Sequence, residues 1–361
     1  VLPICEYFAP RKETMMFEFK RTRRAGIAAA IALSVTLVAA GCASGNTGDS
    51  GNGGEGDAAN LTITMLPKNL GNPYFDTSTK GAAEATKEFG GKFEQVGPTE
   101  ASPTAQVQYI QTAAQQGVGA LIVSANDPDA ICDALGDARS AGVKVVTFDS
   151  DTNPDCRDLF VNQATAEGIA KVQVDLITEQ IGEKGKIAIL SSTPNATNQN
   201  AWIEIMKEEL KAYPNVELVE VAYGGDDDQS AFDKTAALLQ TYPDLAGIVS
   251  PTTVGIAAAG RYLSTSEYKG KVALTGLGTP NQMREYVQDG VVTAFALWNP
   301  ADLGYLSAFA ADALITGEIT GAEGDTFKAG KLGSFTVGAD KTVLLGDPYR
   351  FNADNIGDFD F

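Results

Sequence analysis

The feature that most constrains the fold of this chain is a regular alternation of short apolar runs with longer segments of helical spacing. Residues 61–66, 120–124 and 143–150 form apolar runs, and the segments 73–90 and 103–117 between them have helical periodicity. Strands that alternate with helices in this way predict parallel βαβ units. The runs are apolar on successive residues, which indicates sheets covered by helices on both faces.

The same alternation starts again near residue 164 and places apolar runs at 186–192, 216–223, 246–251 and 272–278. A chain of 361 residues is also long enough for about two domains. We therefore predict an α/β protein with two Rossmann-like parallel sheets, one in each of two lobes, and a cleft between the lobes.

Polar residues follow the predicted strands, and ligands of open parallel sheets bind beyond the carboxyl ends of strands. The residues at these ends are small, polar and rich in hydroxyl groups. They are Pro67-Lys68, Ser124-Ala125-Asn126, Asp149-Ser150-Asp151, Ser191-Ser192, Ser250-Pro251-Thr252 and Leu277-Gly278-Thr279. We expect the ligand site of this chain among these residues.

The N-terminal segment has the order of a secretory signal. A basic stretch, 20–24, precedes the apolar or small residues 25–40, which span roughly 24 Å as a helix and are too short for a bilayer core of ~30 Å. The segment ends in Val38-Ala39-Ala40-Gly41-Cys42, which resembles a bacterial lipobox despite Ala39 in place of the usual Leu. That resemblance implies a signal peptide over 1–41 and a lipid on Cys42; an ordinary signal peptide with a chance cysteine is the alternative.

The segments before and after this predicted signal are also informative. Residues 1–14 add nothing to a signal, so that Met15 or Met16 is a candidate start. Residues 42–59 consist of small, polar and acidic residues and predict a flexible tether behind the lipid. We expect a protein held at the outer side of the cell membrane.

Composition excludes several functions. Histidine is absent, which excludes Ser-His-Asp and Cys-His nucleophile systems and the usual zinc sites that contain histidine. The formal net charge of -19 disfavours nucleic acid as a partner. With Cys42 lipidated and Cys5 in the discarded region, Cys132 and Cys156 remain as a pair in an oxidising compartment. We predict a disulfide between them, with two free buried thiols as the alternative.

A series of segments from about residue 66 onward matches a known family. They are LPKNLGNPYFDTSTKGA, VGPTEAS, SANDPDAICDAL, VKVVTFDSDTNPDCR, NQNAWIEIMK, SPTTVGIAAA, TGLGTPNQMREYV, FALWNPADLGYL and the C-terminal RFNADNIGDFDF. In these segments the chain resembles the type I periplasmic binding proteins of the ribose- and galactose-binding class. The resemblance is closer to the rhamnose-binding and autoinducer-2-binding subfamilies.

The resemblance implies two lobes joined by three crossovers, so that neither lobe is continuous in sequence. We expect the first lobe to comprise 60–154 plus 301–317 and the second 155–300 plus 318–361. It further implies a monomeric, non-enzymatic binding protein without metal or cofactor. That protein would close around a monosaccharide, with rhamnose or a similar deoxy sugar expected, and deliver it to the permease of an ABC transporter.

The candidate ligand residues combine hydrogen-bonding groups for sugar hydroxyls with flat surfaces for the C–H faces. Asn72 and Phe75 match an asparagine-proline-aromatic-aromatic motif of ribose-binding proteins, and Trp298 falls where those proteins place a crossover side chain. The full set is Lys68, Asn72, Phe75, Asp149, Asp151, Asn198, Gln199, Pro251, Thr253 and Trp298. Asp149 can accept two neighbouring hydroxyls, and Lys68 offers three donors.

Other roles remain open for some of these residues. Each aromatic, Tyr74 included, can simply pack in the core. Asp151 can be a turn carboxylate beside Asn153 and Pro154, and Asn198 can be a helix cap. Leu277 offers an apolar contact that suits a methyl group. The run 226–228 is expected to cap a helix or to be solvated, rather than to bind calcium.

Three rival functions follow from the same residues. An autoinducer-2 receptor is the nearest, although its subfamily characteristically has Asp where this chain has Asn198. A secreted glycosidase needs two carboxyl groups separated across a bond, which Asp149 and Asp151 on one strand seldom provide. A sugar-responsive repressor needs a DNA-binding helix pair where this chain has the lipobox-like segment.

Overall fold

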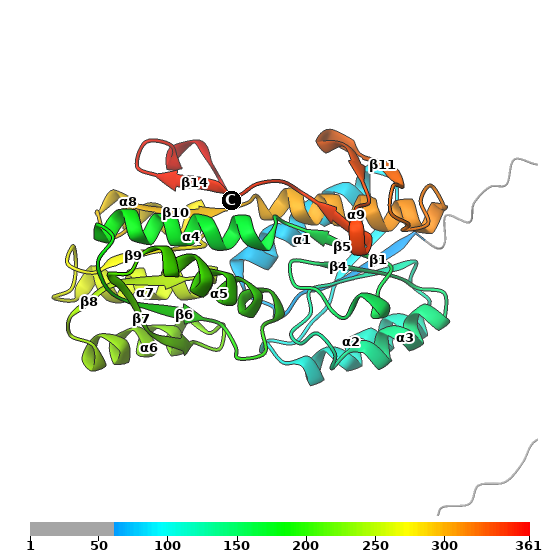
Figure 1. The fold of residues 1–361 in the computed structure, drawn as a ribbon. Coiled ribbons are helices and arrows are strands. Elements are labelled where there is room, and N and C mark those ends of the chain that lie inside the picture. Colours follow the sequence, from blue (N-terminus) through cyan, green and yellow to red (C-terminus); the bar gives the residue numbers. More distant parts are fainter. Residues whose placement is uncertain (1–60) are drawn as a thin grey trace, which may run out of the picture. The chain divides into compact units, whose positions relative to one another are not determined.

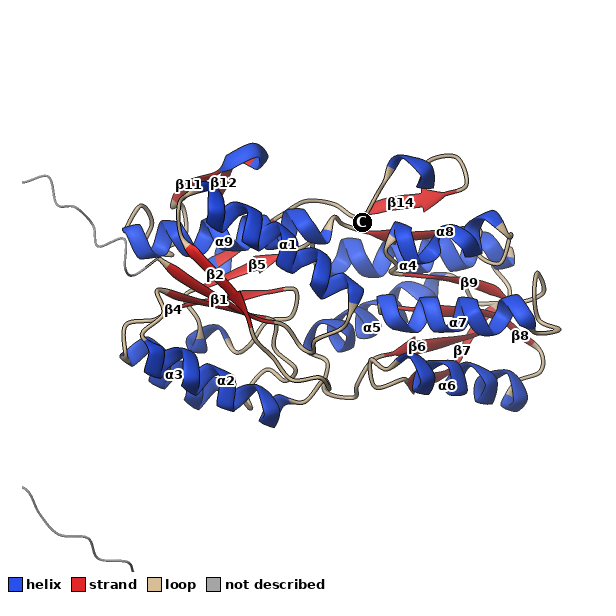
Figure 2. Ribbon diagram, turned by 180° about the vertical axis from the view of Figure 1, so that it is seen from behind, coloured by secondary structure: helices blue, strands red, loops and turns tan. Residues whose placement is uncertain are grey.

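The computed structural model describes residues 61–361. The predicted signal peptide, the candidate lipidation site Cys42 and the tether lie outside the described residues. Within 61–361, the predicted alternation of strands and helices is confirmed, and it builds two parallel sheets with helices on both faces (Figures 1 and 2). None of the helices in this range has the length and apolar character needed to cross a membrane.

The first lobe is built on a six-stranded parallel sheet with the order β13-β5-β4-β3-β1-β2. Its strands are β1 (Thr62–Leu66), β2 (Lys92–Gln95), β3 (Ala120–Val123), β4 (Lys144–Phe148), β5 (Leu159–Asn162) and β13 (Thr342–Leu344). Helices α1 (Pro73–Glu88) and α9 (Pro300–Thr316) cover one face, and α2 (Pro103–Gln116) and α3 (Cys132–Ser140) cover the other (Figure 1).

Successive side chains of β3 show why the apolar runs are continuous. Ile122 packs in the core cluster on the α1 and α9 side, whereas Leu121 and Val123 pack in a separate cluster with Ile110 of α2 and Leu135 of α3. All five side chains are fully buried. A strand between two helical layers therefore needs apolar residues at odd and even positions alike.

The second lobe has a four-stranded parallel sheet with the order β7-β6-β8-β9. Its strands are β6 (Gly185–Ser191), β7 (Val216–Tyr223), β8 (Leu245–Ser250) and β9 (Ala273–Gly276), and its helices are α4 (Ala166–Ile181), α5 (Thr197–Glu209), α6 (Asp228–Thr241), α7 (Thr253–Thr265) and α8 (Pro280–Gln288). β10 (Ala294–Leu297) pairs antiparallel with β14 (Tyr349–Asn352), and a single bridge from Leu277 to Ala296 links this pair to β9. Helices α4 and α5 pack together, as do α6 and α7.

The chain passes between the lobes three times, after β5, after β10 and after β13. Two of the predicted lobe boundaries change as a result. β5 pairs with β4, and β13 pairs with β5, so 159–162 and 342–344 belong to the first sheet although the sequence suggested the second lobe. The antiparallel pair β11 (Thr326–Ala329) and β12 (Gly333–Thr336) also lies beside α9 of the first lobe. The physical reason is backbone pairing. β5 forms its ladder hydrogen bonds with β4 before the chain crosses to the second lobe, and β13 later forms its own with β5.

Helices α1 and α9 begin with the same type of N-terminal cap, and their backbones pack very closely where they cross. Each begins with an asparagine cap followed by proline: the side chain of Asn72 accepts from the amide of Tyr74, and that of Asn299 accepts from the amide of Ala301. Where the helices meet, a β-carbon built on Gly304 would lie 1.9 Å from the carbonyl oxygen of Ser78. Glycine is therefore required at this crossing.

The predicted disulfide between Cys132 and Cys156 is confirmed, and it joins the start of α3 to the short 3-10 helix η2 (Pro154–Cys156). We expect a Cys132→Ala/Cys156→Ala variant to lose about 3 kcal/mol of unfolding free energy, because the bond closes a loop with a sequence separation of 24. Urea unfolding measures the loss, and wild type with its disulfide reduced should show the same loss. Equal stability of the variant and oxidised wild type would contradict the prediction.

Candidate functional site

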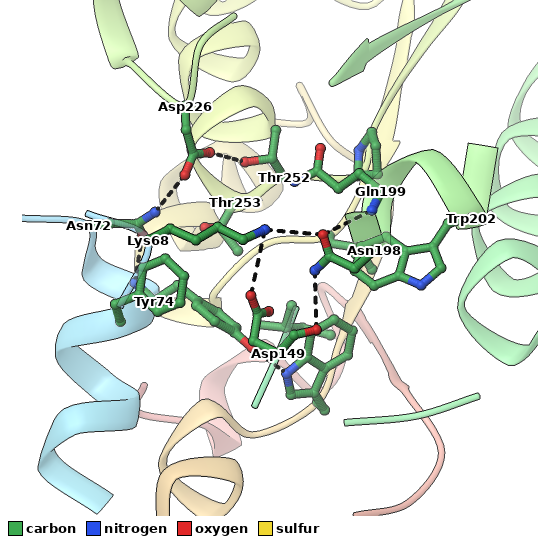
Figure 3. Close-up of a pocket in the computed structure, with 15 residues that line it drawn as sticks. Lys68, Asn72, Tyr74, Asp149, Asn198, Gln199, Trp202, Asp226, Thr252 and Thr253 are labelled. Atoms are coloured by element: carbon green, nitrogen blue, oxygen red, sulfur yellow. Dashed lines mark hydrogen bonds and ion pairs between the residues drawn. The ribbon is translucent and has the colours of Figure 1, made fainter. Parts of the chain in front are cut away.

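A pocket lies between the two lobes, at the carboxyl ends of strands from both sheets (Figure 3). It holds about 370 Å³ of free space when the part open to solvent is included. The first lobe and the crossover residue contribute Lys68, Asn72, Tyr74, Phe75, Asp149 and Trp298, and the second lobe contributes Asn198, Gln199, Trp202, Asp226, Pro251, Thr252, Thr253, Leu277 and Leu297. Nine of the ten residues predicted from the sequence line it.

Lys68 and Asp149 form the charged centre of the pocket. Lys68 follows β1 and Asp149 follows β4, and only 5% and 6% of their surfaces are exposed. The Lys68 Nζ lies 3.8 Å from the Asp149 Oδ2, which also accepts a hydrogen bond of 2.8 Å from the Ser124 hydroxyl. Two buried charges that face each other in this way leave lone pairs and ammonium protons for polar groups of a ligand.

The first turn of α5 brings two amide side chains to the same place. Asn198 accepts from the Lys68 Nζ at 3.1 Å and donates to the backbone oxygen of Asp149 at 3.3 Å, so it joins the second lobe to the first (Figure 3). The carbonyl of Gln199 accepts from the Ser191 hydroxyl and the Ser192 amide. These bonds fix the side-chain amide of Gln199 with its nitrogen available as a donor.

Aromatic side chains form an apolar wall that runs from one lobe to the other. Phe148, Phe75, Tyr74, Trp298 and Trp202 contact one another in series, edge to face, with ring centroids 5.1–6.2 Å apart. Trp298 follows β10 at the second crossover, and its indole nitrogen donates to the Tyr74 hydroxyl at 2.9 Å. Burial, with the nearby Asp149 carboxylate, holds the pKa of Tyr74 well above its usual value, so its hydroxyl stays protonated.

Asp151 does not line this pocket. Its two oxygens accept from the Nε and one terminal nitrogen of Arg157, at 2.6 and 2.7 Å, and Arg157 is almost fully buried. The sequence prediction relied on alternate residues of one strand sharing a face, but β4 ends at Phe148. Asp149 then takes a left-handed conformation with a φ of 60°, which breaks the alternation that the prediction assumed.

Three lining residues were not expected from the sequence to bind ligand: Trp202, Leu297 and Asp226. Trp202 lies one helical turn after Asn198 on α5, so helical spacing alone could have placed it on the same face. Leu297 is the last residue of β10, immediately before Trp298. Asp226 was assigned to a capping or solvated run, and local sequence offers no signal that distinguishes it from Asp227 and Asp228.

Asp226 reaches the pocket from the loop after β7. Its Oδ1 accepts from the Thr252 hydroxyl at 2.7 Å, and its Oδ2 accepts from the side-chain amide of Asn72 at 3.2 Å (Figure 3). Burial raises the pKa of the Asp226 carboxyl, although Lys68 and the two donors lower it. The bond to Asn72 is a second direct link between the lobes.

The site can bind hydroxyl groups, and it offers little for covalent chemistry. It combines carboxylate acceptors, amide and ammonium donors, and threonine hydroxyls with an aromatic wall and the apolar side chains of Leu277 and Leu297. Within residues 61–361, no cluster of three or more acidic, histidine or cysteine side chains is arranged to hold a metal ion. A ring with several hydroxyls and an apolar edge matches these groups.

Comparison with known proteins gives one family match over most of the chain. Residues 63–319 match the family described as a periplasmic binding protein domain. Among curated proteins, a ribose import binding protein from Bacillus subtilis is 25% identical over 272 residues, which cover 73% of this chain and 84% of that protein.

Solved structures match at higher identity. A sugar ABC transporter protein from Actinomyces odontolyticus is 54% identical, with a TM-score of 0.69, over 84% of this chain and 99% of its own. An ABC transporter solute-binding protein from Clostridium phytofermentas, solved with bound L-rhamnose, is 37% identical with a TM-score of 0.80, over 82% and 97% of the two chains. The LsrB protein from Clostridium saccharobutylicum, solved with AI-2, is 28% identical with a TM-score of 0.78, over 83% and 100%.

Proposed function

This chain belongs to the periplasmic binding protein family, and we propose that it captures a neutral monosaccharide of the deoxy-sugar type, such as L-rhamnose, for an ABC importer. The family consists of binding proteins, and the chain is not an enzyme. The observation that carries the proposal is the pocket between the lobes, which is lined both by the charged pair Asp149 and Lys68 and by the apolar side chains of Leu277 and Leu297.

The polar lining residues support a polyol as the ligand. Asp149 has lone pairs beyond those used by Ser124 and can accept hydroxyl groups, while Lys68 and the Gln199 nitrogen can donate to hydroxyl oxygens. Two carboxylates and one ammonium line the pocket, which disfavours sugar acids and sugar phosphates because like charges repel.

The apolar lining residues support a ligand with a methyl group. Leu277 and Leu297 are 2% and 1% exposed, and both come from the second lobe. A hydroxyl group pressed against such side chains loses its hydrogen bonds to water without replacement, whereas a methyl group gains contact. This argument, together with the L-rhamnose bound by the Clostridium phytofermentas protein, favours a deoxy sugar.

Capture proceeds by closure of the lobes. The crossovers at 163–165, 298–299 and 345–348 are the segments about which the lobes can move. A ligand that contacts Asp149 in one lobe and Gln199 in the other gains both contacts only in the closed form, so its binding energy shifts the population toward closure. The closed surface is then presented to a membrane permease, and Cys42 carries the lipid that holds the protein outside the membrane.

Titration calorimetry with a matched pair of sugars tests this proposal. L-Mannose differs from L-rhamnose only by a hydroxyl group on the sixth carbon, so the pair isolates the contribution of the methyl group. We expect L-rhamnose to bind at least about tenfold more tightly. Equal or tighter binding of L-mannose would contradict the deoxy-sugar assignment, and no binding of any monosaccharide would contradict the function itself.

Autoinducer-2 is the second candidate ligand, favoured by the similarity to the AI-2-bound protein from Clostridium saccharobutylicum. Its subfamily characteristically has aspartate at the position of Asn198, which here is held by Lys68 and by the backbone of Asp149. Competition between L-rhamnose and autoinducer-2 in the same calorimeter separates the two candidates. Displacement of L-rhamnose by a small excess of autoinducer-2 would favour the receptor.

A further inference from the structure

The three consecutive carboxylates after β7 have three different environments. Asp227 caps α6, because its Oδ1 accepts from the amide of Ser230 at 2.8 Å. Asp228 forms an exposed ion pair with Arg261. Asp226 alone turns inward, where it lines the pocket between Thr252 and Asn72 (Figure 3). Helix capping accounts for Asp227 and solvent exposure accounts for Asp228, but neither accounts for Asp226.

The backbone conformation of Asp226 repeats that of Asp149. Asp226 has a φ of 56° and Asp149 a φ of 60°, both in the left-handed region. This conformation costs roughly 1 kcal/mol or more for most residues, and aspartate is among the few that tolerate it. Each of the two residues lies just beyond a strand of its own lobe, β4 or β7, and each points its carboxylate into the same pocket. Disfavoured backbone conformations of this kind concentrate at binding sites.

The carboxylate of Asp226 also has unused capacity to accept hydrogen bonds. A carboxylate offers about four acceptor positions, and the Thr252 hydroxyl and the Asn72 amide fill two of them. Among residues 61–361, it forms no ion pair with any lysine or arginine. Burial raises the pKa of this carboxyl, which means that the folded protein offers the ionised form too few partners. Hydroxyl groups of a ligand would supply them.

We propose that Asp226 is a second ligand-binding carboxylate, contributed by the second lobe, that accepts ligand hydroxyl groups opposite Asp149. This inference rests on the proposed function and adds to it a requirement on the ligand. The ligand must carry hydroxyl donors on two separate edges, one for each carboxylate, as a monosaccharide ring does. A molecule with donors on a single edge satisfies Asp149 and leaves the remaining acceptor positions of Asp226 unfilled.

The bond from Asn72 gives Asp226 a role in closure as well. Asn72 caps α1 in the first lobe, so its side-chain amide reaches Asp226 only when the lobes are together. Ligand hydroxyls and the Asn72 amide then stabilise the same ionised carboxylate. The ligand and the contact that holds the lobes together therefore meet at one side chain.

Calorimetry with L-rhamnose on Asp226→Asn, with Asp228→Asn as the matched control, tests this proposal. Asparagine has the same shape and tolerates the left-handed backbone, but it lacks the charge and one acceptor oxygen. We expect Asp226→Asn to weaken binding at least about tenfold, since hydrogen bonds to charged groups are strong. Asp228→Asn removes the same charge two residues away, on the surface, and should change affinity less than threefold.

Thermal unfolding of the free proteins separates loss of binding from loss of fold. The raised pKa of Asp226 means that the folded state holds this proton more tightly than the unfolded state does, so the ionised group opposes folding at neutral pH. Asp226→Asn should therefore melt at the same temperature as wild type or higher, while binding less tightly. A structural role would instead lower the melting temperature.

The possible results distinguish failure of this inference from failure of the function on which it rests. Wild type that binds L-rhamnose, with Asp226→Asn within threefold of it, overturns the inference and leaves the function standing. The inference is also overturned if Asp228→Asn loses as much affinity as Asp226→Asn. Wild type that binds no monosaccharide at all overturns both.

Discussion

Asp149→Asn is expected to lower the affinity for L-rhamnose by at least about 100-fold and to leave the protein folded. Each hydrogen bond from a ligand to a charged acceptor contributes about 1.5–3 kcal/mol, and a carboxylate at this position can accept two hydroxyls. Asparagine tolerates the left-handed backbone at this position and can still accept from Ser124. Titration calorimetry measures the loss, and circular dichroism confirms the fold.

Asp151→Asn is the matched control for this prediction, because it removes the same charge two residues away. The carboxylate of Asp151 holds the guanidinium of Arg157, which is 1% exposed and also donates to the backbone oxygens of Asp340 and Lys341. Its loss leaves a buried charge without a partner, at a cost of about 3–5 kcal/mol in unfolding free energy. Affinity measured on the folded fraction should stay within threefold of wild type. The reverse pattern, with binding lost in Asp151→Asn and kept in Asp149→Asn, would contradict the pocket described above.

Gly304→Ala is expected to lower the unfolding free energy by about 3 kcal/mol or more. The added methyl group would lie 1.9 Å from the carbonyl oxygen of Ser78, so α1 and α9 would have to separate. Because the strands of the first sheet pack against α9, the displacement would propagate into a close-packed core. Urea unfolding monitored by fluorescence measures the change.

Gly136→Ala provides the control, since Gly136 also lies within a helix, α3, and a β-carbon there would have no heavy atom within 4 Å. Alanine favours the helix by about 1 kcal/mol over glycine, so this variant should be as stable as wild type or slightly more stable. A similar loss in both variants would show that helix propensity or the unfolded state, and not the contact between α1 and α9, governs the effect.

The sequence predicts the architecture well because its signals are local. The apolar run before Ser124 and the helical spacing after Asn72 each depend on neighbouring residues, and both are confirmed. The edge of the first sheet is different. β13 has three residues and pairs with β5, about 180 positions earlier, and only hydrogen bonding in the folded chain assigns either strand to this sheet.

The residues of the candidate site also fall into those that local sequence signals place and those that they do not. Lys68, Gln199 and Trp298 could be placed in the pocket because each follows a predicted strand or begins a helix of a matching segment. Asp151 and Asp226 could not be assigned, because a single left-handed residue decides where each carboxylate points. Conformations of individual loop residues depend on the packing around them, which spacing and composition do not report.

The return of the chain to the first lobe after β10 constrains how the protein must be made. The first sheet receives its edge strand from residues 342–344, and α9, which covers that sheet, begins only at Pro300. A nascent chain emerging from a ribosome or a translocation channel therefore cannot finish the first lobe until nearly all of the polypeptide has been released. We expect the two lobes to mature together after synthesis, and fragments cut between them to be poor folders.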